Sequence, residues 1–161
     1  MTGIVPADAL ALGIGAFFGA LSRYQAGRIA TEFIANDPNK FGKFAGWHTA
    51  GINVGGSFLL GGISGAPTVA KVNGSSAVPR SSAASTSPLF QNFQGLSPRA
   101  KLMMGVGFCG SFTTFSTFSV DVVSWIQQGQ VGKAASYVAA NNVGGFIAAG
   151  VGMALVKKFF G

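Results

Sequence analysis

Long stretches without a charged residue dominate the hydrophobic pattern of this chain. Four such runs cover residues 9–22, 44–70, 102–120 and 134–156. A helix needs about 20 predominantly apolar residues to cross a bilayer, and the first run reaches that length when its helix begins at Pro6 and continues past Arg23. We therefore predict an all-α membrane protein with four transmembrane helices, at about 6–27, 47–66, 100–126 and 133–157.

The polar segments between these runs differ in length and composition. Residues 29–43 and 127–133 form short connections, whereas 67–98 is rich in Ser, Ala, Gly and Pro and shows no periodic pattern. We expect 67–98 to be a long flexible loop without a function of its own. The length suits one domain, so 1–161 is predicted to be a single four-helix transmembrane domain.

Small residues recur at a spacing of four inside each predicted helix. The sets are Gly15 and Gly19, Gly51 and Gly55, Gly61 and Gly65, and Gly144 with Ala148 and Gly152. Such spacing lets helix backbones approach closely where water cannot drive their association. We interpret nearly all of these residues as packing positions.

The composition agrees with a membrane protein and excludes other classes. Only 9% of the residues are charged, whereas an ordinary soluble domain has about 25%. The formal net charge of +7 would suggest nucleic-acid binding in a soluble protein, but here the basic residues flank the apolar runs. We expect no nucleic-acid partner. The single cysteine, Cys109, excludes an internal disulfide.

The basic residues give almost no bias between the two sides of the membrane. With four crossings, one side holds the six residues Lys71, Arg80, Arg99, Lys101, Lys157 and Lys158, and the other holds the five residues Arg23, Arg28, Lys40, Lys43 and Lys133. A chain without bias can insert in both orientations, and two opposite copies can pair into an antiparallel, dual-topology dimer. Alternatively, Arg99 and Lys101, close to a helix end, fix one orientation.

The third apolar run contains a polar interruption at residues 107–118. Three glycines, at 105, 107 and 110, precede four hydroxyl residues at 113, 114, 116 and 117, which alternate with phenylalanines. Glycine in a helix interior costs about 1 kcal/mol relative to alanine. Because a broken helix is tolerated in a membrane only where it lines a cavity or is buried in protein, we predict a broken third helix with an ion or substrate site.

Few residues in the chain support catalysis. His48 is the only histidine, Asp121 is the only carboxylate near a membrane run, and no nucleophile–base pair or phosphate loop is visible, so we predict that the protein is not an enzyme. The remaining candidates are uncharged: Asn53 in the second run, and Phe115 with Phe118 on one helix face. Ring edges, hydroxyls and amide hydrogens suit an anion, whereas the carbonyls of a broken backbone at 110–113 suit a cation.

Several stretches of the chain, taken together, resemble the Fluc (CrcB) fluoride channels, which are small dual-topology fluoride exporters. Residues 107–118 are similar to the third-helix signature of this family, and Gly19, Ala20, Arg23 and Tyr24 match its first-helix motif. Thr49 with residues 53–61 resembles the second-helix motif, and Tyr137 lies where the fourth helix carries a tyrosine. The likeness spans all four predicted helices and leaves out the long loop and the termini.

The resemblance implies a fluoride channel with two pores in an antiparallel dimer, located in the cell membrane as a multi-pass protein surrounded by lipid. The partner would be a second copy of the chain or a diverged sister subunit. The implied pore residues are Asn53, Phe115, Phe118, Ser116, Thr117 and Tyr137, with Arg23 near the vestibule. A structural sodium ion would be held by backbone carbonyls of Gly110 and Thr113 from both subunits.

The chain also departs from the family pattern. Asn141 and Gly145 stand where the family usually has hydroxyls, and Ser111 replaces a common glycine. Two rival functions are open at this point. A small dual-topology transporter of another solute would couple to protons and depend on Asp121, whereas a non-transporting scaffold would show no flux and tolerate changes at Asn53.

Overall fold

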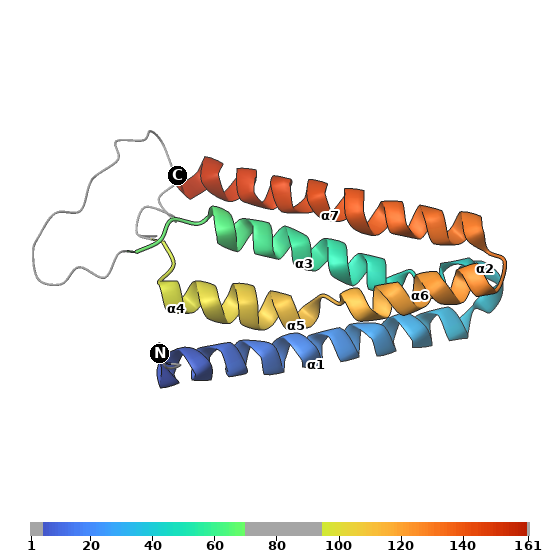
Figure 1. Cartoon of the computed structure of the whole chain (residues 1–161), viewed down its shortest axis with the longest axis horizontal. Helices are drawn as coiled ribbons and strands as arrows, with labels where there is room; N and C mark the ends of the chain where they lie inside the picture. The colour runs from blue at the N-terminus through green and yellow to red at the C-terminus, as the bar shows by residue number, and fades with distance from the viewer. Residues whose placement is uncertain (1–4, 70–94, 161) are drawn as a thin grey trace, which may run out of the picture.

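The computed structural model of the protein describes residues 5–69 and 95–160, and these are almost entirely helical (Figure 1). The long helices are α1 (Pro6–Asn36), α3 (His48–Gly65) and α7 (Val131–Phe160), with α2 (Pro38–Phe41) and the 3₁₀ turn η1 (Gly42–Phe44) between the first two. Four consecutive helical segments lie end to end and form an interrupted rod: α4 (Pro98–Lys101), the π-helical η3 (Leu102–Cys109), α5 (Gly110–Phe112) and α6 (Phe115–Gln127). The described residues contain no β-strand, only an isolated bridge between Thr68 and Leu96.

The first helix is longer than its apolar run. It begins with Pro6 in its first turn and continues past residue 27 to Asn36. Arg28 and Glu32 are one helical turn apart in this extension and form an exposed ion pair of 3.0 Å. The helix ends before Asp37, whose side chain accepts a hydrogen bond of 3.2 Å from the amide of Lys40 and so caps α2.

The two ends of the expected loop at 67–98 are held together. The amide of Leu96 donates to the carbonyl of Pro67 at 2.9 Å, and the amide of Val69 donates to the carbonyl of Leu96 at 3.1 Å. Lys101 adds a hydrogen bond of 2.6 Å from Nζ to the carbonyl of Ala66. Residues 70–94, the greater part of this loop, lie outside the described residues. The described residues on either side of 70–94 therefore lie next to each other, beside the C-terminal end of α3 and the N-terminal end of α4.

Helix α1 packs along η3 and α5 (Figure 1). The approach is close because glycines face the neighbouring backbone. A Cβ atom placed at Gly15 would overlap the carbonyl oxygen of Met103, and one at Gly19 would overlap that of Phe108. The small residues of the first apolar run therefore serve helix contact.

Helix α3 packs in the same manner along α7. A Cβ atom at Gly61 would overlap the carbonyl oxygen of Ala149, and one at Gly152 would overlap that of Phe58. Gly51 and Gly55 of α3 differ, since a Cβ atom at either position would meet nothing within 4 Å in the described chain. Their face of α3 is open in the single chain.

Within residues 5–69 and 95–160, two segments are long and apolar enough to cross a membrane: Pro98–Gln127 and Val131–Phe160, each of 30 residues. Many large apolar side chains point outward, including Phe17, Phe146 and Ile147, which are 64%, 76% and 61% exposed. An outer surface of this kind suits contact with lipid. The prediction of a helical membrane protein is thus supported by the structure, while the number of crossings remains a prediction.

Candidate functional site

The rod from Pro98 to Gln127 is interrupted at Thr113 and Thr114, both of which have extended backbone conformations. Both the amide and the hydroxyl of Thr113 donate to the carbonyl of Cys109, at 3.0 and 2.9 Å, and close the end of α5. The hydroxyl oxygen of Thr114 accepts from the amide of Thr117 at 3.2 Å and caps α6. The predicted break is therefore present, and threonine side chains satisfy helix ends on both sides of it.

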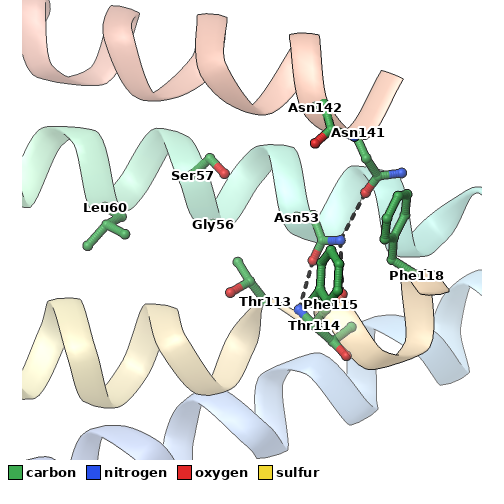
Figure 2. Close-up of a pocket in the computed structure, with 10 residues that line it drawn as sticks. All are labelled: Asn53, Gly56, Ser57, Leu60, Thr113, Thr114, Phe115, Phe118, Asn141 and Asn142. Carbon is green, nitrogen blue, oxygen red and sulfur yellow. Dashed lines mark hydrogen bonds between the residues drawn. The ribbon is translucent and has the colours of Figure 1, made fainter. Parts of the chain in front are cut away.

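The amide side chain of Asn53 binds the peptide groups exposed by this break (Figure 2). Its Oδ1 accepts from the Thr114 amide at 2.8 Å, and its Nδ2 donates to the Thr114 carbonyl at 3.1 Å. Backbone groups in an apolar surrounding must find such partners, because an unpaired group there costs several kcal/mol. Asn53 thus fixes α3 against the break.

A relay of hydrogen bonds continues from Asn53 to the backbone of α7, and a separate hydrogen bond joins α7 to α6. Asn53 Nδ2 donates to Asn141 Oδ1 at 2.9 Å, and Asn141 Nδ2 donates to the carbonyl of Tyr137 at 3.0 Å. The hydroxyl of Tyr137, a fully buried residue, donates to Asp121 Oδ2 at 2.9 Å. The hydrogen bonds from the break thus end at the main-chain carbonyl of Tyr137, and the side-chain hydroxyl of the same residue makes a separate bond to the carboxylate of Asp121 on α6.

An open cavity of about 220 Å³ lies beside the break, between α3, α6 and α7 (Figure 2). Its lining consists of Asn53, Gly56, Ser57, Leu60, Thr113, Thr114, Phe115, Phe118, Asn141 and Asn142. None of these residues carries a formal charge. Residue Phe115 is 79% exposed and Phe118 is 8% exposed. Their ring centroids are 5.6 Å apart, with the ring planes inclined by 44°. The cavity offers amides, hydroxyls and ring edges without an ionised partner.

The structure brings three of the predicted pore residues, Asn53, Phe115 and Phe118, to this cavity. Ser116 and Thr117 lie at the start of α6, outside the cavity lining, and their hydroxyl oxygens are 3.2 and 3.0 Å from the hydroxyl oxygen of Thr114. Both side chains belong to exposed residues. They extend the polar surface from the break along α6.

Tyr137 lies behind Phe118 and does not line the cavity. Its ring stacks on Phe118 with centroids 5.5 Å apart, and the rings of Trp47 and Trp125 contact it edge-on at 5.7 and 4.7 Å. Tyr137 therefore supports the position of Phe118 and connects the cavity wall to Asp121.

Arg23 lies on the opposite side of the break, in a second cavity of about 470 Å³. The other lining residues of this cavity are Tyr24, Gly27, Arg28, Thr31 and Glu32 of α1, with His48 of α3. Arg23 Nη1 donates to the carbonyl of Thr113 at 3.4 Å. The guanidinium thus joins this basic cavity to the broken backbone.

The carbonyls of Gly110 and Thr113 differ in their partners. The amide of Thr113 donates to the carbonyl of Cys109, and the amide of Thr114 donates to Oδ1 of Asn53. Neither amide therefore donates to the carbonyl of Gly110. The Thr113 carbonyl accepts from Arg23 and retains a second lone pair. Carbonyl oxygens are suitable ligands for a hard cation, so the donor chemistry fits sodium.

Six lining residues of the cavity are not among the predicted site residues, and four of them are polar: Ser57, Thr114, Asn141 and Asn142. Asn141 and Asn142 form an amide pair inside the fourth apolar run, and this was the available signal. Because an amide side chain within an apolar membrane run needs a polar partner, this pair favours a position beside a polar site. Nothing in the sequence indicated that Thr114 would present its peptide group to Asn53.

An interrupted helix beside an uncharged polar cavity, within a bundle of apolar helices, is typical of membrane transport proteins. The family model described as "CrcB-like protein, Camphor Resistance (CrcB)" matches residues 10–153, and the chain belongs to this family. It is 33% identical over 144 residues to the fluoride-specific ion channel FluC of Novosphingobium aromaticivorans, with 89% of this chain and 91% of the relative covered.

Other relatives agree with this assignment. The FluC protein of Rhodospirillum centenum is 32% identical over 151 residues, covering 92% of this chain and 94% of the relative. That of Methanocaldococcus jannaschii is 31% identical over 154 residues, covering 95% and 97%. The names of these relatives describe ion channels, so the family is of the transport type and not of an enzyme type.

Proposed function

We propose that this protein is a fluoride-selective ion channel that lowers cytoplasmic fluoride by passive export. The observation that carries the proposal is the match, over nearly the whole chain, to relatives named as fluoride-specific channels. The cavity beside the break supports it, because its donors and ring edges are uncharged. A small anion can be held there and released without the tight pairing that an ionised residue would impose.

In this proposal, weak hydrogen-bond donors along a narrow path recognise fluoride. A phenyl ring has a positive edge, so Phe115 and Phe118 present hydrogens to an anion. Asn53 supplies an amide, and the hydroxyls of Ser116 and Thr117 continue the polar surface along α6. Tyr137 contributes by holding the Phe118 ring. Dehydrated fluoride gains these contacts in place of its water shell.

The working unit in this proposal is an antiparallel dual-topology dimer in the cell membrane, with four crossings per chain and two pores. The open face of α3 at Gly51 and Gly55 offers a surface for the second copy or a sister subunit. A structural sodium ion on the dimer axis would take the carbonyls of Gly110 and Thr113 from both chains, and would fix the subunit interface electrostatically. The near-equal distribution of basic residues supports dual topology.

The direct test is ion release from liposomes containing the purified protein. Vesicles loaded with potassium fluoride, and treated with valinomycin to balance charge, are expected to release fluoride within the dead time of an ion-selective electrode. Matched vesicles loaded with potassium chloride should retain their contents as well as protein-free vesicles do. Equal release of the two halides would contradict the selectivity, and no release of either would contradict the channel.

Replacing Arg23 by glutamine is expected to reduce fluoride flux several-fold when fluoride is dilute and ionic strength is low. The side chain lies in the basic cavity next to the break, where a positive charge raises the local anion concentration. The Debye length falls from about 30 Å at 0.01 M salt to about 8 Å at 0.15 M, so the deficit should shrink as salt is added. Initial rates in an inert salt series measure this, and a salt-independent deficit would contradict the electrostatic role.

A further inference from the structure

The amide of Asn53 has no N–H left for a ligand in this structure. The Thr114 amide can only donate, so the atom that faces it must be Oδ1, and the assignment of both Asn53 atoms follows. The two hydrogens on Nδ2 are then directed to the carbonyl of Thr114 and to Oδ1 of Asn141. An anion that binds Asn53 has to replace one of these two acceptors.

The orientation of Asn141 is fixed in the same way from the other end of the relay. The carbonyl of Tyr137 can only accept, so Nδ2 of Asn141 must face it, and Oδ1 is left to face Asn53. Backbone groups at Thr114 and Tyr137 thus determine the direction of every hydrogen bond between them. Asn141 presents an acceptor to the cavity side of Asn53, as Figure 2 shows.

The two acceptors on Asn53 Nδ2 are not equally replaceable. The Thr114 carbonyl belongs to the backbone of the break and moves only with the helix ends. Asn141 holds its oxygen on a half-buried side chain at the edge of the cavity. Rotation of one side chain withdraws it, at the loss of the hydrogen bond from Asn141 Nδ2 to the Tyr137 carbonyl.

We infer that Asn141 Oδ1 is a built-in competitor of the transported anion for Asn53 Nδ2. This inference rests on the proposed function, since it concerns the acceptor that fluoride displaces on entering the site. An amide oxygen and a fluoride ion both accept hydrogen bonds at similar distances, and only one of them can accept from this N–H of Asn53. Asn141 is therefore a positioning residue that sets the fluoride concentration at which the channel is half-saturated.

Replacing Asn141 by leucine tests the competition directly, because leucine has nearly the same volume and no acceptor. The concentration of internal fluoride that gives half-maximal release is expected to fall about fivefold, equivalent to about 1 kcal/mol, the usual net value of one hydrogen bond. A donor role for Asn141 would raise this concentration. The sign of the shift therefore separates competition from direct binding by Asn141, and an unchanged or raised value would overturn the inference.

Replacing Asn141 by aspartate is expected to have the opposite effect. A carboxylate keeps the acceptor, strengthens its hydrogen bond to Asn53 and adds a negative charge beside the cavity. The half-saturating fluoride concentration should rise at least tenfold at pH 7. A value at or below that of the unchanged protein would contradict the inference.

The matched control is Asn36→Leu, which is also an asparagine-to-leucine change. Asn36 is the exposed last residue of α1 and lines neither cavity. Its half-saturating concentration should stay within twofold of the unchanged protein. Asn141→Ala, which removes the acceptor without introducing a hydroxyl donor, provides a second variant if the leucine variant does not assemble. If the unchanged protein releases no fluoride, the proposed function fails; if it does and Asn141→Leu shows no decrease, only this inference fails.

Discussion

Replacing Phe115 by isoleucine is expected to reduce fluoride flux about a hundredfold while the protein remains folded. The ring borders the cavity and is 79% exposed in the single chain, so its removal loses little packing. What is lost is the positive ring edge, and isoleucine offers no comparable donor. For scale, removing one preorganised donor from the oxyanion hole of an enzyme costs about 10²–10³ in kcat.

The measurement is fluoride release from liposomes, with size-exclusion chromatography of each variant to confirm assembly. Phe146→Ile is the matched control, since Phe146 is 76% exposed on α7 and does not line the cavity. Flux through that variant should stay within twofold of the unchanged protein. Phe118→Ile is a less selective test, because Phe118 also stacks on Tyr137. Retention of most of the flux in Phe115→Ile would eliminate the ring-edge mechanism.

Replacing Gly61 by alanine is expected to destabilise the protein by at least about 1–3 kcal/mol, the usual cost of forcing extra atoms into a packed contact. A Cβ atom at this position would overlap the carbonyl oxygen of Ala149, so α3 and α7 would have to separate. The contact lies in the same helix pair that holds Asn53 next to Asn141. A lower midpoint of thermal unfolding in detergent and a reduced flux are therefore expected together.

The control for this change is Gly150→Ala, also in a helix and also a single added methyl group. A Cβ atom at Gly150 would meet nothing within 4 Å. Alanine is a better helix former than glycine by about 1 kcal/mol, so this variant should be as stable as the unchanged protein or slightly more stable. Equal stability of the Gly61 and Gly150 variants would show that the close approach of α3 and α7 is not required.

Local features of the chain were readable without coordinates. The helical, membrane-type character follows from the length of charge-free runs, because the bilayer thickness sets a minimum length. The break at Thr113 and Thr114 follows from clustered glycines and hydroxyl residues, since these weaken a helix locally. The motifs around residues 19–24, 53–61 and 107–118 were sufficient to suggest the family that the comparisons then showed.

The partners of each side chain required the tertiary structure. Asn53 binds Thr114 and Asn141, which are 61 and 88 positions away, and Arg23 reaches Thr113 across 90 positions. Tyr137, a predicted pore residue, stacks on Phe118 and is not part of the lining of this cavity, a placement that the sequence does not encode. No periodicity in the sequence encodes such pairings, because lipid and side chains are equally apolar and the pattern of a membrane helix does not mark which neighbour it contacts. Close backbone contact and the directions of a few hydrogen bonds decide that arrangement, and both exist only once the helices have packed.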